Sequence, residues 1–376
     1  ACFLISFLPK KENDTVTWFS FANFPEHFYL VLILCALSLV FVILLHRARK
    51  KQKNVCKPAL AGTICACILC TASIVYFGAQ TPTGAKRYID QAIDPEQEVS
   101  LSVDSNHFFR IDISENCDNY PMLWKLPCMR TFHSIVPASI MEFYHAIGVT
   151  RDVASRADLS YYTLRGLFSV QYYYDQIAET DLSTESDPQS IALPEFSYRN
   201  TENGFRVYEN TAYVPMGFTF DQYITESDWE ACADNKRASL LMHAIVLNDR
   251  QVEQYGSNMQ RMDSDHTTCT KEHYLEDCAA RAASSCDSFT YDSNGFTATI
   301  SAKSDNLVFF SVPYEAGWSA TVDGKPVSIE QVDVGFMAVP VEAGDHTIVC
   351  TYETPGLHAG LLLSAGGLVL LLAYLL

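Results

Sequence analysis

Tyrosine and arginine side chains that could bind a ligand gather between residues 161 and 174. Tyr161, Tyr162 and Tyr172–Tyr174 flank Arg165 in the sequence LSYYTLRGLFSVQYYYD. Aromatic rings beside a guanidinium group could contact a phosphate-bearing chain, because arginine binds phosphate through its planar fork. The same residues also fit a strand that buries one aromatic face, since aromatic side chains favour strands. The second interpretation needs fewer assumptions, but it leaves the first open.

Arg110 and Trp318 are two further candidates for ligand binding. Arg110 lies within HFFRIDI, which alternates apolar and polar residues as a strand does. It could bind a phosphate group there, although an internal ion pair with an acidic residue is the commoner role. Trp318 in PYEAGW could stack on a sugar ring, or it could belong to the core of a sheet. The structural role is favoured for each residue.

An acidic loop is the pattern that comes nearest to a metal site. It contains Asp263, Asp265, His266 and Glu272, but it lacks the central glycine and the spacing of an EF-hand. The sequence also lacks the G-x-S-x-G, H-E-x-x-H, Walker A and G-x-G-x-x-G patterns, which argues against a self-contained hydrolase, protease or nucleotide-dependent enzyme. No catalytic residue, metal site or cofactor is therefore assigned, and a requirement for a divalent metal is left open.

Long apolar runs predict how the chain is anchored. The run HFYLVLILCALSLVFVILLH has no charged residue and is long enough to span a bilayer, which takes about 20 residues. A second run is rich in small residues that suit close contact between helices. We predict transmembrane helices at 27–45, 58–79 and 356–376, and the end of a truncated one at 1–8. The chain is thus expected to be a piece of a larger polytopic protein.

Basic residues determine the predicted orientation. The loop 46–57 carries six of them and no acid, so the positive-inside rule places it in the cytoplasm. The loop 9–26 and the segment 80–355 then lie outside. That segment has 18 basic and 41 acidic residues, a net charge of −23, within a chain of net charge −18. Such a domain is not expected to bind nucleic acid, because phosphate groups need a basic partner.

Cysteines in the outer segment could form disulfides, since an extracytoplasmic domain is exposed to oxidising conditions. Cys117 could pair with Cys128, and two of Cys269, Cys278 and Cys286 could pair with each other. An odd number of cysteines in this segment means that they cannot all pair internally. The sequence does not choose among these pairings.

Sequence patterns divide the outer segment into an α+β domain at 80–286 and an antiparallel β-sandwich at 287–355. In the first part we predict strands at 107–113, 205–210 and 213–224, and a helical stretch at 133–149 that is broken at Pro137. A helix over 229–247, capped by Ser227 or Asp228, and another at 273–283 complete it. Asn294-Gly295, Asp323-Gly324 and Gly344-Asp345 predict tight hairpins in the second part. We therefore expect a membrane protein with transmembrane α-helices and a large extracytoplasmic α+β domain that ends in an antiparallel β-sandwich.

A combination of residues in the predicted sandwich and in two upstream regions carries a family resemblance. The residues are Phe309–Trp318, Val322–Lys325, Gly335, Phe336, Ala343–His346, Tyr352, Gly360 and Ser364, with Phe205–Asn210, Pro215, Gly217, Phe218, Phe109, Arg110, Tyr120 and Ser134 upstream. In this combination the chain resembles the C-terminal portion of the bacterial membrane protein YfhO family, which are GT-C-type glycosyltransferase-like proteins.

The resemblance implies a function and partners for the full-length protein. It would transfer a sugar, outside the membrane, from a polyprenyl-phosphate donor to an envelope polymer such as a teichoic acid, in contact with membrane lipid. The first outer loop, where GT-C enzymes place an acidic catalytic residue, has no counterpart in this sequence, so no catalytic residue is carried over. The alternative is a non-catalytic, membrane-anchored module that binds envelope glycan or partner proteins. The substrate-binding candidates are Arg110, Tyr161, Tyr162, Arg165 and Trp318.

Overall fold

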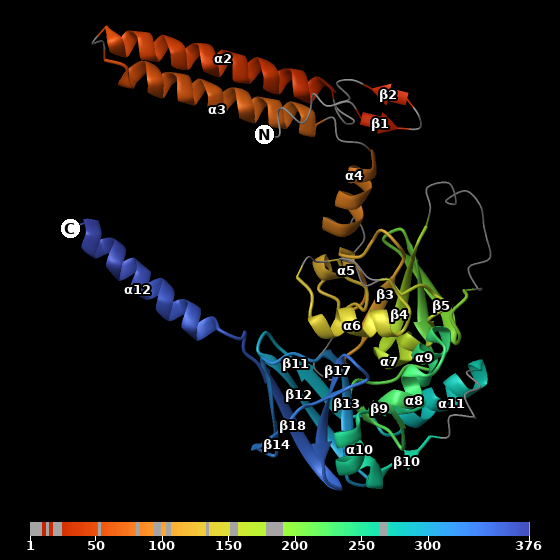
Figure 1. The fold of residues 1–376 in the computed structure, drawn as a ribbon. Helices are drawn as coiled ribbons and strands as arrows, with labels where there is room; N and C mark the ends of the chain where they lie inside the picture. Colours follow the sequence, from red (N-terminus) through yellow and green to blue (C-terminus); the bar gives the residue numbers. More distant parts are fainter. Residues whose placement is uncertain are drawn as a thin grey trace. The chain divides into compact units, whose positions relative to one another are not determined.

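The computed structural model divides the chain into two compact units, Ala1–Lys86 and Arg87–Leu376. It describes residues 10–12, 15–17, 25–51, 54–79, 83–93, 99–102, 107–132, 135–150, 157–177, 191–262 and 270–375. Figure 1 shows the course of the chain through these elements.

The first unit contains two long helices, α2 (Pro25–Lys50) and α3 (Cys56–Gly78). They contact each other closely, because a Cβ atom at Gly62 of α3 would lie only 2.1 Å from Cζ of Phe41 in α2. The sequence prediction that small residues in this run serve helix contact therefore holds at Gly62. A short hairpin of β1 (Lys10–Glu12) and β2 (Thr15–Thr17) precedes α2.

Apolar helices that could cross a membrane are present in both units. Among the described residues, Cys56–Tyr76 and Leu357–Tyr374 are long and apolar enough by length and composition. The first lies in α3 and the second in α12 (Leu357–Leu375). Helix α2 covers the predicted span 27–45, and Leu39 within it is 63% exposed. Large exposed apolar side chains on these helices are compatible with a lipid environment.

A four-stranded sheet at the start of the second unit carries Arg110. Its strands run in the order β3, β4, β6, β5, with β3 parallel to β4 and the other neighbours antiparallel. The bounds are Arg110–Ile113 (β3), Val170–Gln176 (β4), Phe196–Glu202 (β5) and Phe205–Asn210 (β6). The strands expected at 107–113 and 205–210 are present, whereas the polar strand β5 was not predicted.

The single helix predicted over residues 229–247 is wrong. The structure has two short helices and a strand, α8 (Glu226–Glu230), α9 (Asp234–Leu240) and β9 (Ile245–Leu247). The N-cap of α8 is Thr225, whose side chain accepts a hydrogen bond from the backbone N–H of Asp228. The caps predicted from the sequence, Ser227 and Asp228, therefore do not take that role. Strand β9 is buried and pairs in parallel with β8 (Gln222–Thr225). Such a continuous apolar run has no periodicity that distinguishes it from a buried helix.

Short elements surround this small parallel sheet, whose strand order is β10, β8, β9. Helix α10 begins with a capping box between Asn248 and Gln251, and α11 confirms the helix expected near 273–283. The remaining bounds are Thr83–Tyr88 (α4), Ile89–Ile93 (a π-helical turn), Tyr120–Leu123 (α5), Ala138–Ala146 (α6), Thr163–Leu167 (α7), Gln222–Thr225 (β8), Asp249–Tyr255 (α10), Gly256–Asn258 (a 3-10 turn), Gln260–Arg261 (β10) and Lys271–Ala282 (α11).

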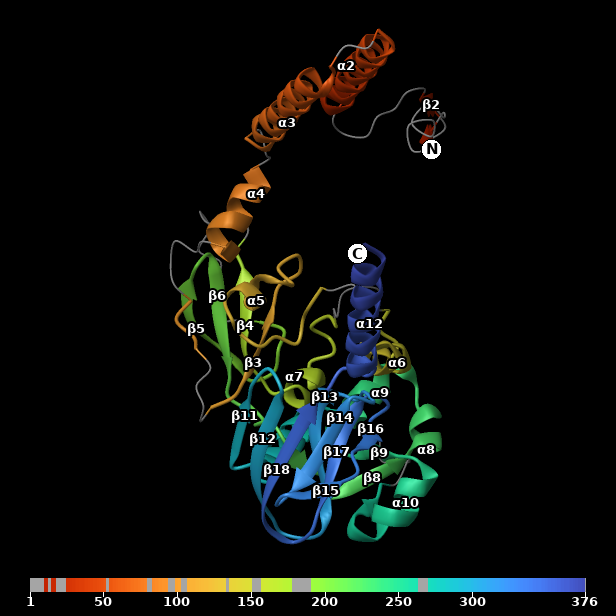
Figure 2. The same cartoon turned by 90° about the vertical axis from the view of Figure 1, so that its left-hand side faces the viewer.

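Two antiparallel sheets occupy the C-terminal part of the second unit (Figure 2). Their facing side chains share one core, in which Phe296 and Ile348 of one sheet meet Phe310 and Met337 of the other. The five-stranded sheet contains Ser288–Tyr291 (β11), Gly295–Ala302 (β12), Gly344–Tyr352 (β18), Trp318–Val322 (β14) and Lys325–Val327 (β15). The four-stranded sheet contains Glu330–Val332 (β16), Phe336–Val341 (β17), Asn306–Pro313 (β13) and Phe218–Thr219 (β7).

The two sheets are continuous with the upstream α+β region. Strand β7, from outside the predicted sandwich, pairs with β13. The ring of Phe336 in β17 lies 4.7 Å from that of Phe143 in α6 and 5.5 Å from that of Phe168, centroid to centroid. The boundary drawn from the sequence at residue 286 therefore falls inside one compact unit, because the upstream helices and the sheets bury each other's aromatic side chains.

Candidate functional site

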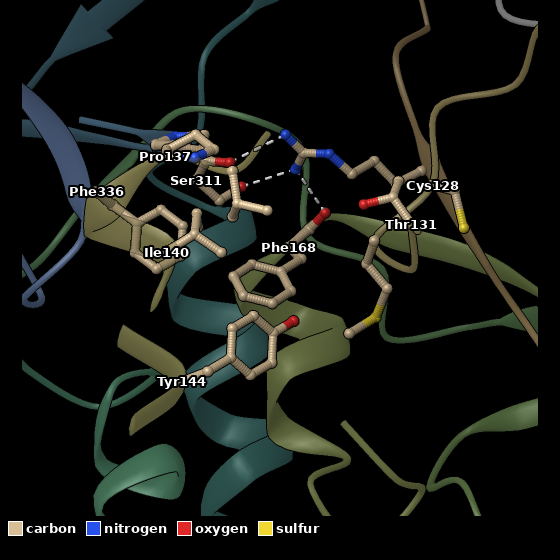
Figure 3. Close-up of a pocket in the computed structure, with 12 residues that line it drawn as sticks. Cys128, Thr131, Pro137, Ile140, Tyr144, Phe168, Ser311 and Phe336 are labelled. Carbon is tan, nitrogen blue, oxygen red and sulfur yellow. Dashed lines mark hydrogen bonds between the residues drawn. The ribbon is translucent and has the colours of Figure 1, made fainter. Parts of the chain in front are cut away.

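A hollow of about 230 Å³ opens where β3, α6 and the end of β13 meet (Figure 3). Its polar side comes from Arg110, Ser311, Thr131 and Cys128. Its apolar side comes from Met129, Val136, Pro137, Ile140, Tyr144, Phe168, Pro313 and Phe336. The hollow therefore combines one cationic group with a largely hydrophobic wall, a common composition for a small-ligand site.

Arg110 is held in place by neutral acceptors. Its Nη1 donates to the carbonyl oxygen of Phe168 and to Oγ of Ser311, each at 2.8 Å. Its Nη2 donates to the carbonyl oxygen of Ser311 at 3.0 Å. Among the described residues, these three bonds leave two of the five N–H groups of the guanidinium for another acceptor. The face of the Phe108 ring lies 5.4 Å from Arg110 Cζ.

No carboxylate neutralises Arg110 among the described residues, so the internal ion pair expected from the sequence is not found. Burial lowers the pKa of Arg110 to about 10, because desolvation disfavours the charged form. The group still carries its charge at neutral pH. A half-buried, uncompensated guanidinium with free donors is a favourable partner for an anion.

An ion-paired cluster holds part of the wall of the hollow. Asp112, two residues after Arg110 on β3, is completely buried and binds two arginines. Its Oδ2 lies 2.8 Å from Nη2 of Arg165, and its Oδ1 lies 3.2 Å from Nε of Arg130. Because Arg130 follows Cys128 and Met129, this cluster ties the loop that lines the hollow to β3.

Arg165 does not share a ligand surface with Arg110. Its side chain is completely buried, and it donates to the carbonyl oxygens of Ala157, Asp158 and Tyr161 as well as to Asp112. Every one of its bonds is internal, so its guanidinium is not accessible to a phosphate-bearing chain in this structure. The structural interpretation of this residue accounts for all of its contacts.

The tyrosines predicted beside Arg165 lie in several environments. Tyr161 and Tyr162 pack at the edge of the main core, and the ring of Tyr162 lies 5.2 Å from that of Tyr274. Tyr172 and Tyr174 point into a separate core together with Phe205. These residues do not form one exposed aromatic and cationic cluster, and ligand binding by Tyr161 or Tyr162 stays a prediction.

Trp318 lies in β14 and packs at the edge of the sandwich core. Its ring centroid lies 5.7 Å from that of Phe296 and 5.2 Å from that of Tyr352. Tyr352 also lines a second, larger hollow, which includes Glu315. The structure thus assigns Trp318 a packing role and places it beside a possible ligand site, while stacking on a sugar stays a prediction.

Asp333 is a buried carboxyl group that no sequence pattern singles out. Its side chain is completely buried. Its Oδ1 accepts a hydrogen bond from the backbone N–H of Val246 at 2.7 Å, whereas its Oδ2 has no hydrogen-bond partner among the described residues. Burial raises its pKa to about 8. It sits at a tight turn with a left-handed φ of 47°, and this turn leads directly into Phe336 of the hollow.

The described residues contain no group of three or more histidine, cysteine or acidic side chains that could hold a metal ion. Of the acidic loop singled out in the sequence, Asp263, Asp265 and His266 lie outside the described residues. Cys117, Cys128, Cys278 and Cys286 are free thiols, so the pairing of Cys117 with Cys128 is not formed. Cys269 lies outside the described residues.

Sequence patterns do not identify most of the residues that line the hollow. Ser311 and Phe336 belong to the residues that carry the family resemblance, Tyr144 lies in the stretch predicted to be helical, and no sequence pattern singles out Phe168. Their signal is tertiary, because Ser311 is 201 positions from its partner Arg110. Only the run FFSVPYE, in which a serine interrupts an apolar strand, could have directed attention to this place.

Comparison with known proteins identifies relatives of the chain. Residues 15–283 and 267–364 match the family described as bacterial membrane protein YfhO. A protein of Bacillus subtilis (strain 168), named "Uncharacterized protein YfhO", is 28% identical over 89 residues. This alignment covers 24% of the chain and only 10% of the relative. No solved structure matches the chain.

Proposed function

Because this chain belongs to the bacterial membrane protein YfhO family, we propose that the full-length protein is a cell-envelope glycosyltransferase. It moves a sugar from a polyprenyl-phosphate donor to an envelope polymer such as a teichoic acid. Under this proposal the chain has spans at 27–45, 58–79 and 356–376, and residues 80–355 lie outside the cell. The basic loop 46–57 supports this orientation.

The hollow at Arg110 is the observation that carries the proposal. A lipid-linked sugar phosphate has an anionic group joined to a long apolar chain, and the hollow offers a guanidinium with two free donors beside an apolar wall. Neighbours of the lining residues in sequence are also apolar and exposed. Phe132 is 45% exposed, Ile135 90% and Met141 38%. Exposed apolar side chains of this size favour contact with lipid or with a partner.

In this role the chain's own residues bind and orient the substrate. Arg110 holds the phosphate, and Ser311 and the carbonyl oxygen of Phe168 fix the direction of the guanidinium. The apolar wall excludes water from the charged pair, which strengthens the attraction between the two charges. The catalytic residue is not assigned to this chain.

A complementation experiment tests both parts of the proposal. In a strain that lacks the full-length gene, sugar on the envelope polymers is measured after return of the wild-type gene, Arg110→Gln, Arg110→Lys or the control Lys303→Gln. We expect the deletion to abolish one glycan modification. Arg110→Gln should lower it by about tenfold at equal protein level, because a charge-assisted hydrogen bond is lost. Arg110→Lys should retain part of it, since it keeps the charge.

Two results would overturn the proposal at different points. Unchanged glycosylation of every candidate acceptor in the deletion strain would reject the transferase. Full activity of Arg110→Gln in a strain whose deletion does abolish the sugar would reject the role of the hollow alone. Glycan binding by the purified chain without transfer from any lipid-linked sugar would favour the non-catalytic module instead.

A further inference from the structure

The stretch 119–141 differs in charge from its surroundings. It contains no acidic residue, and it is the longest run without one in the segment 80–355, which has 41 acids. Its lysine and its arginine are Lys125, which is exposed, and Arg130, which is buried beside Asp112. Anionic lipid headgroups attract basic side chains and repel acidic ones. This stretch is therefore the part of the segment that an anionic bilayer repels least.

Large apolar side chains are exposed along the same stretch. Met122 and Leu123 of α5 are 67% and 43% exposed, and Phe132 and Ile135 are 45% and 90% exposed. Met141 of α6 is exposed as well. We call these five residues the apolar face. A group of exposed apolar side chains marks a surface that a partner or a lipid covers.

Hydrogen bonds join the parts of the apolar face. The side-chain amide of Asn119, which precedes α5, donates to the carbonyl oxygen of Phe132, and its oxygen accepts from the Phe132 amide, each at 3.0 Å. Phe132 therefore lies beside α5. Ile135 follows three positions later and comes three positions before α6 begins at Ala138. Figure 2 shows α5 and α6 at the end of the second unit where β18 leads into α12.

The chain enters the second unit next to α5. The ring of Tyr88 lies 5.2 Å from that of Tyr120, centroid to centroid, and Nε1 of Trp124 donates to the carbonyl oxygen of Gln91 at 3.0 Å. Helix α3 ends at Gly78, and the second unit starts nine positions later. That length of chain spans at most about 30 Å. The contact with α5 is therefore close, along the chain, to an apolar helix.

The chain leaves the second unit next to α6. Pro355 and Ala138 line the same hollow, the one that includes Glu315. Helix α12 begins at Leu357, two positions after Pro355. Both α3 and α12 contain a stretch that is long and apolar enough to cross a membrane. The apolar face therefore adjoins both points at which these helices join the second unit.

We propose that the apolar face lies on the lipid bilayer that holds α3 and α12, with its side chains at the upper ends of the acyl chains. The two attachment points favour a bilayer over a protein partner, because both helices bring the same membrane to this end of the unit. The lack of acids in the stretch favours it too. Trp124 and Tyr88 are of the residue types enriched at membrane–water interfaces. The inference rests on the proposed spans at 58–79 and 356–376, and it does not require a transferase activity.

This contact also places the Arg110 hollow beside lipid. Cys128, Pro137 and Ile140 line that hollow and belong to the same stretch as the apolar face (Figure 3). A lipid-linked phosphate then reaches Arg110 from the bilayer without carrying its apolar chain through water.

Tryptophan placed at one position at a time measures the contact, because bromine on an acyl chain quenches a tryptophan that it touches. The whole chain is held at one copy per nanodisc of phosphatidylglycerol, with and without brominated acyl chains. Ile135→Trp and Met122→Trp should each lose about half of the emission that the new tryptophan adds, since interfacial side chains lie about 5–10 Å into the boundary between headgroups and acyl chains.

Two further positions serve as references. Lys303→Trp, exposed in the turn after β12, should keep its emission. The neighbouring Ala302 pairs with Gly344, at the opposite end of β18 from Tyr352 and about 26 Å from it. Leu368→Trp, in α12, reports the span itself and should be quenched.

Charge placed on the apolar face should detach it from lipid. With Met122→Trp as the reporter, the double variant Phe132→Asp with Ile135→Asp should reduce the quenching at least about twofold, because a carboxylate is costly to place in lipid. Both side chains are exposed, and circular dichroism checks that the fold is unchanged. The control Lys303→Asp with the same reporter should keep the full quenching.

Each other result overturns the proposal in a recognisable way. Quenching of Leu368→Trp without quenching of Ile135→Trp and Met122→Trp rejects the contact and retains the span, whereas no quenching of Leu368→Trp rejects both. Shielding of Ile135→Trp from aqueous iodide without quenching by lipid assigns the face to a protein partner or a second copy of the chain. Equal quenching of Lys303→Trp means that the unit does not present this face to the bilayer.

Discussion

Arg110 and Asp112 lie two positions apart on β3, and within the part of the chain that the structure describes only Asp112 has ionic partners. Asp112 binds Arg165 and Arg130 at 2.8 and 3.2 Å, whereas Arg110 binds two carbonyl oxygens and one hydroxyl. The strand therefore places a neutralised charge in the core and an unneutralised one at the wall of a hollow. The nearest acid to Arg110 in the strand is already occupied, so the guanidinium is available to a ligand.

An anionic ligand with an apolar tail should stabilise the protein through Arg110. Geranyl phosphate at about ten times its dissociation constant should add about 1.4 kcal/mol to the free energy of unfolding, because it binds only the folded state. Thermal unfolding of the chain in nanodiscs measures this effect, with geraniol as the uncharged control. Arg110→Gln should lose the stabilisation. Equal protection by geraniol, or protection that persists in Arg110→Gln, contradicts the assignment of the anion to Arg110.

Replacement of Asp112 should destabilise the second unit strongly. Asp112→Asn leaves the guanidinium groups of Arg130 and Arg165 buried without an acid, and loss of one partner of a buried ion pair costs about 3 to 5 kcal/mol. Denaturant titration followed by tryptophan fluorescence measures the change. The control Glu276→Gln removes an exposed carboxylate from α11 and should change the stability by less than about 0.5 kcal/mol. Similar midpoints for the two variants would refute the structural role of the cluster.

Asp333 should make stability fall as pH rises. Burial raises its folded-state pKa to about 8 from an ordinary value of 3.8, so the folded protein keeps a proton that the unfolded chain releases. The contribution of this group to the free energy of unfolding is therefore fully present below the unfolded-state pKa. It declines between about pH 4 and pH 8, by at most about 1.4 kcal/mol per pH unit. Asp333→Asn should lose this pH dependence, because the asparagine side chain has no charge. Its carbonyl oxygen can still accept the hydrogen bond from the backbone N–H of Val246.

Urea unfolding at several pH values between about pH 5 and pH 8 measures the difference between wild type and Asp333→Asn. The variant should gain stability relative to the wild type as pH increases. Parallel pH profiles for the two proteins would mean that Asp333 does not retain its proton in the folded state. Asp305→Asn, at an exposed position in the turn before β13, serves as the control.

Local sequence patterns predicted the regular elements and failed where distant residues decide the outcome. Alternation revealed β3 and β6, and Asp323-Gly324 marked a hairpin whose two residues have φ angles of 51° and 77°. The apolar residues 245–247 form a strand because they pair with β8, and the amide of Val246 donates a hydrogen bond to Asp333; the local pattern contains neither partner. Parallel pairing of β3 with β4 depends on contacts about 60 positions apart, for which the sequence has no local signal.

The site was predicted only in part for the same reason. Arg110 was recognised as a possible anion ligand, but its environment is made by Phe168 and Ser311, which are 58 and 201 positions away. Arg165 looked equivalent in the sequence and is enclosed by Asp112, 53 positions away. Which of two arginines is neutralised is therefore a tertiary property, and residue type and spacing do not determine it.

Close packing of α2 on α3 should make Gly62 intolerant of a larger side chain. Alanine normally stabilises a helix by about 1 kcal/mol relative to glycine. At Gly360 in α12, an added Cβ would have no atom of the described residues within 4 Å apart from the helix's own backbone, so Gly360→Ala should show this gain or be neutral. At Gly62 the added Cβ would lie 2.1 Å from the ring of Phe41, so Gly62→Ala should destabilise the helix pair instead. Thermal unfolding and protease resistance of the two variants in nanodiscs measure this contrast.

A combined Gly62→Ala and Phe41→Ala variant should recover part of the loss, because the smaller side chain removes the clash. Equal stability of Gly62→Ala and Gly360→Ala would show that the two helices do not pack at this position.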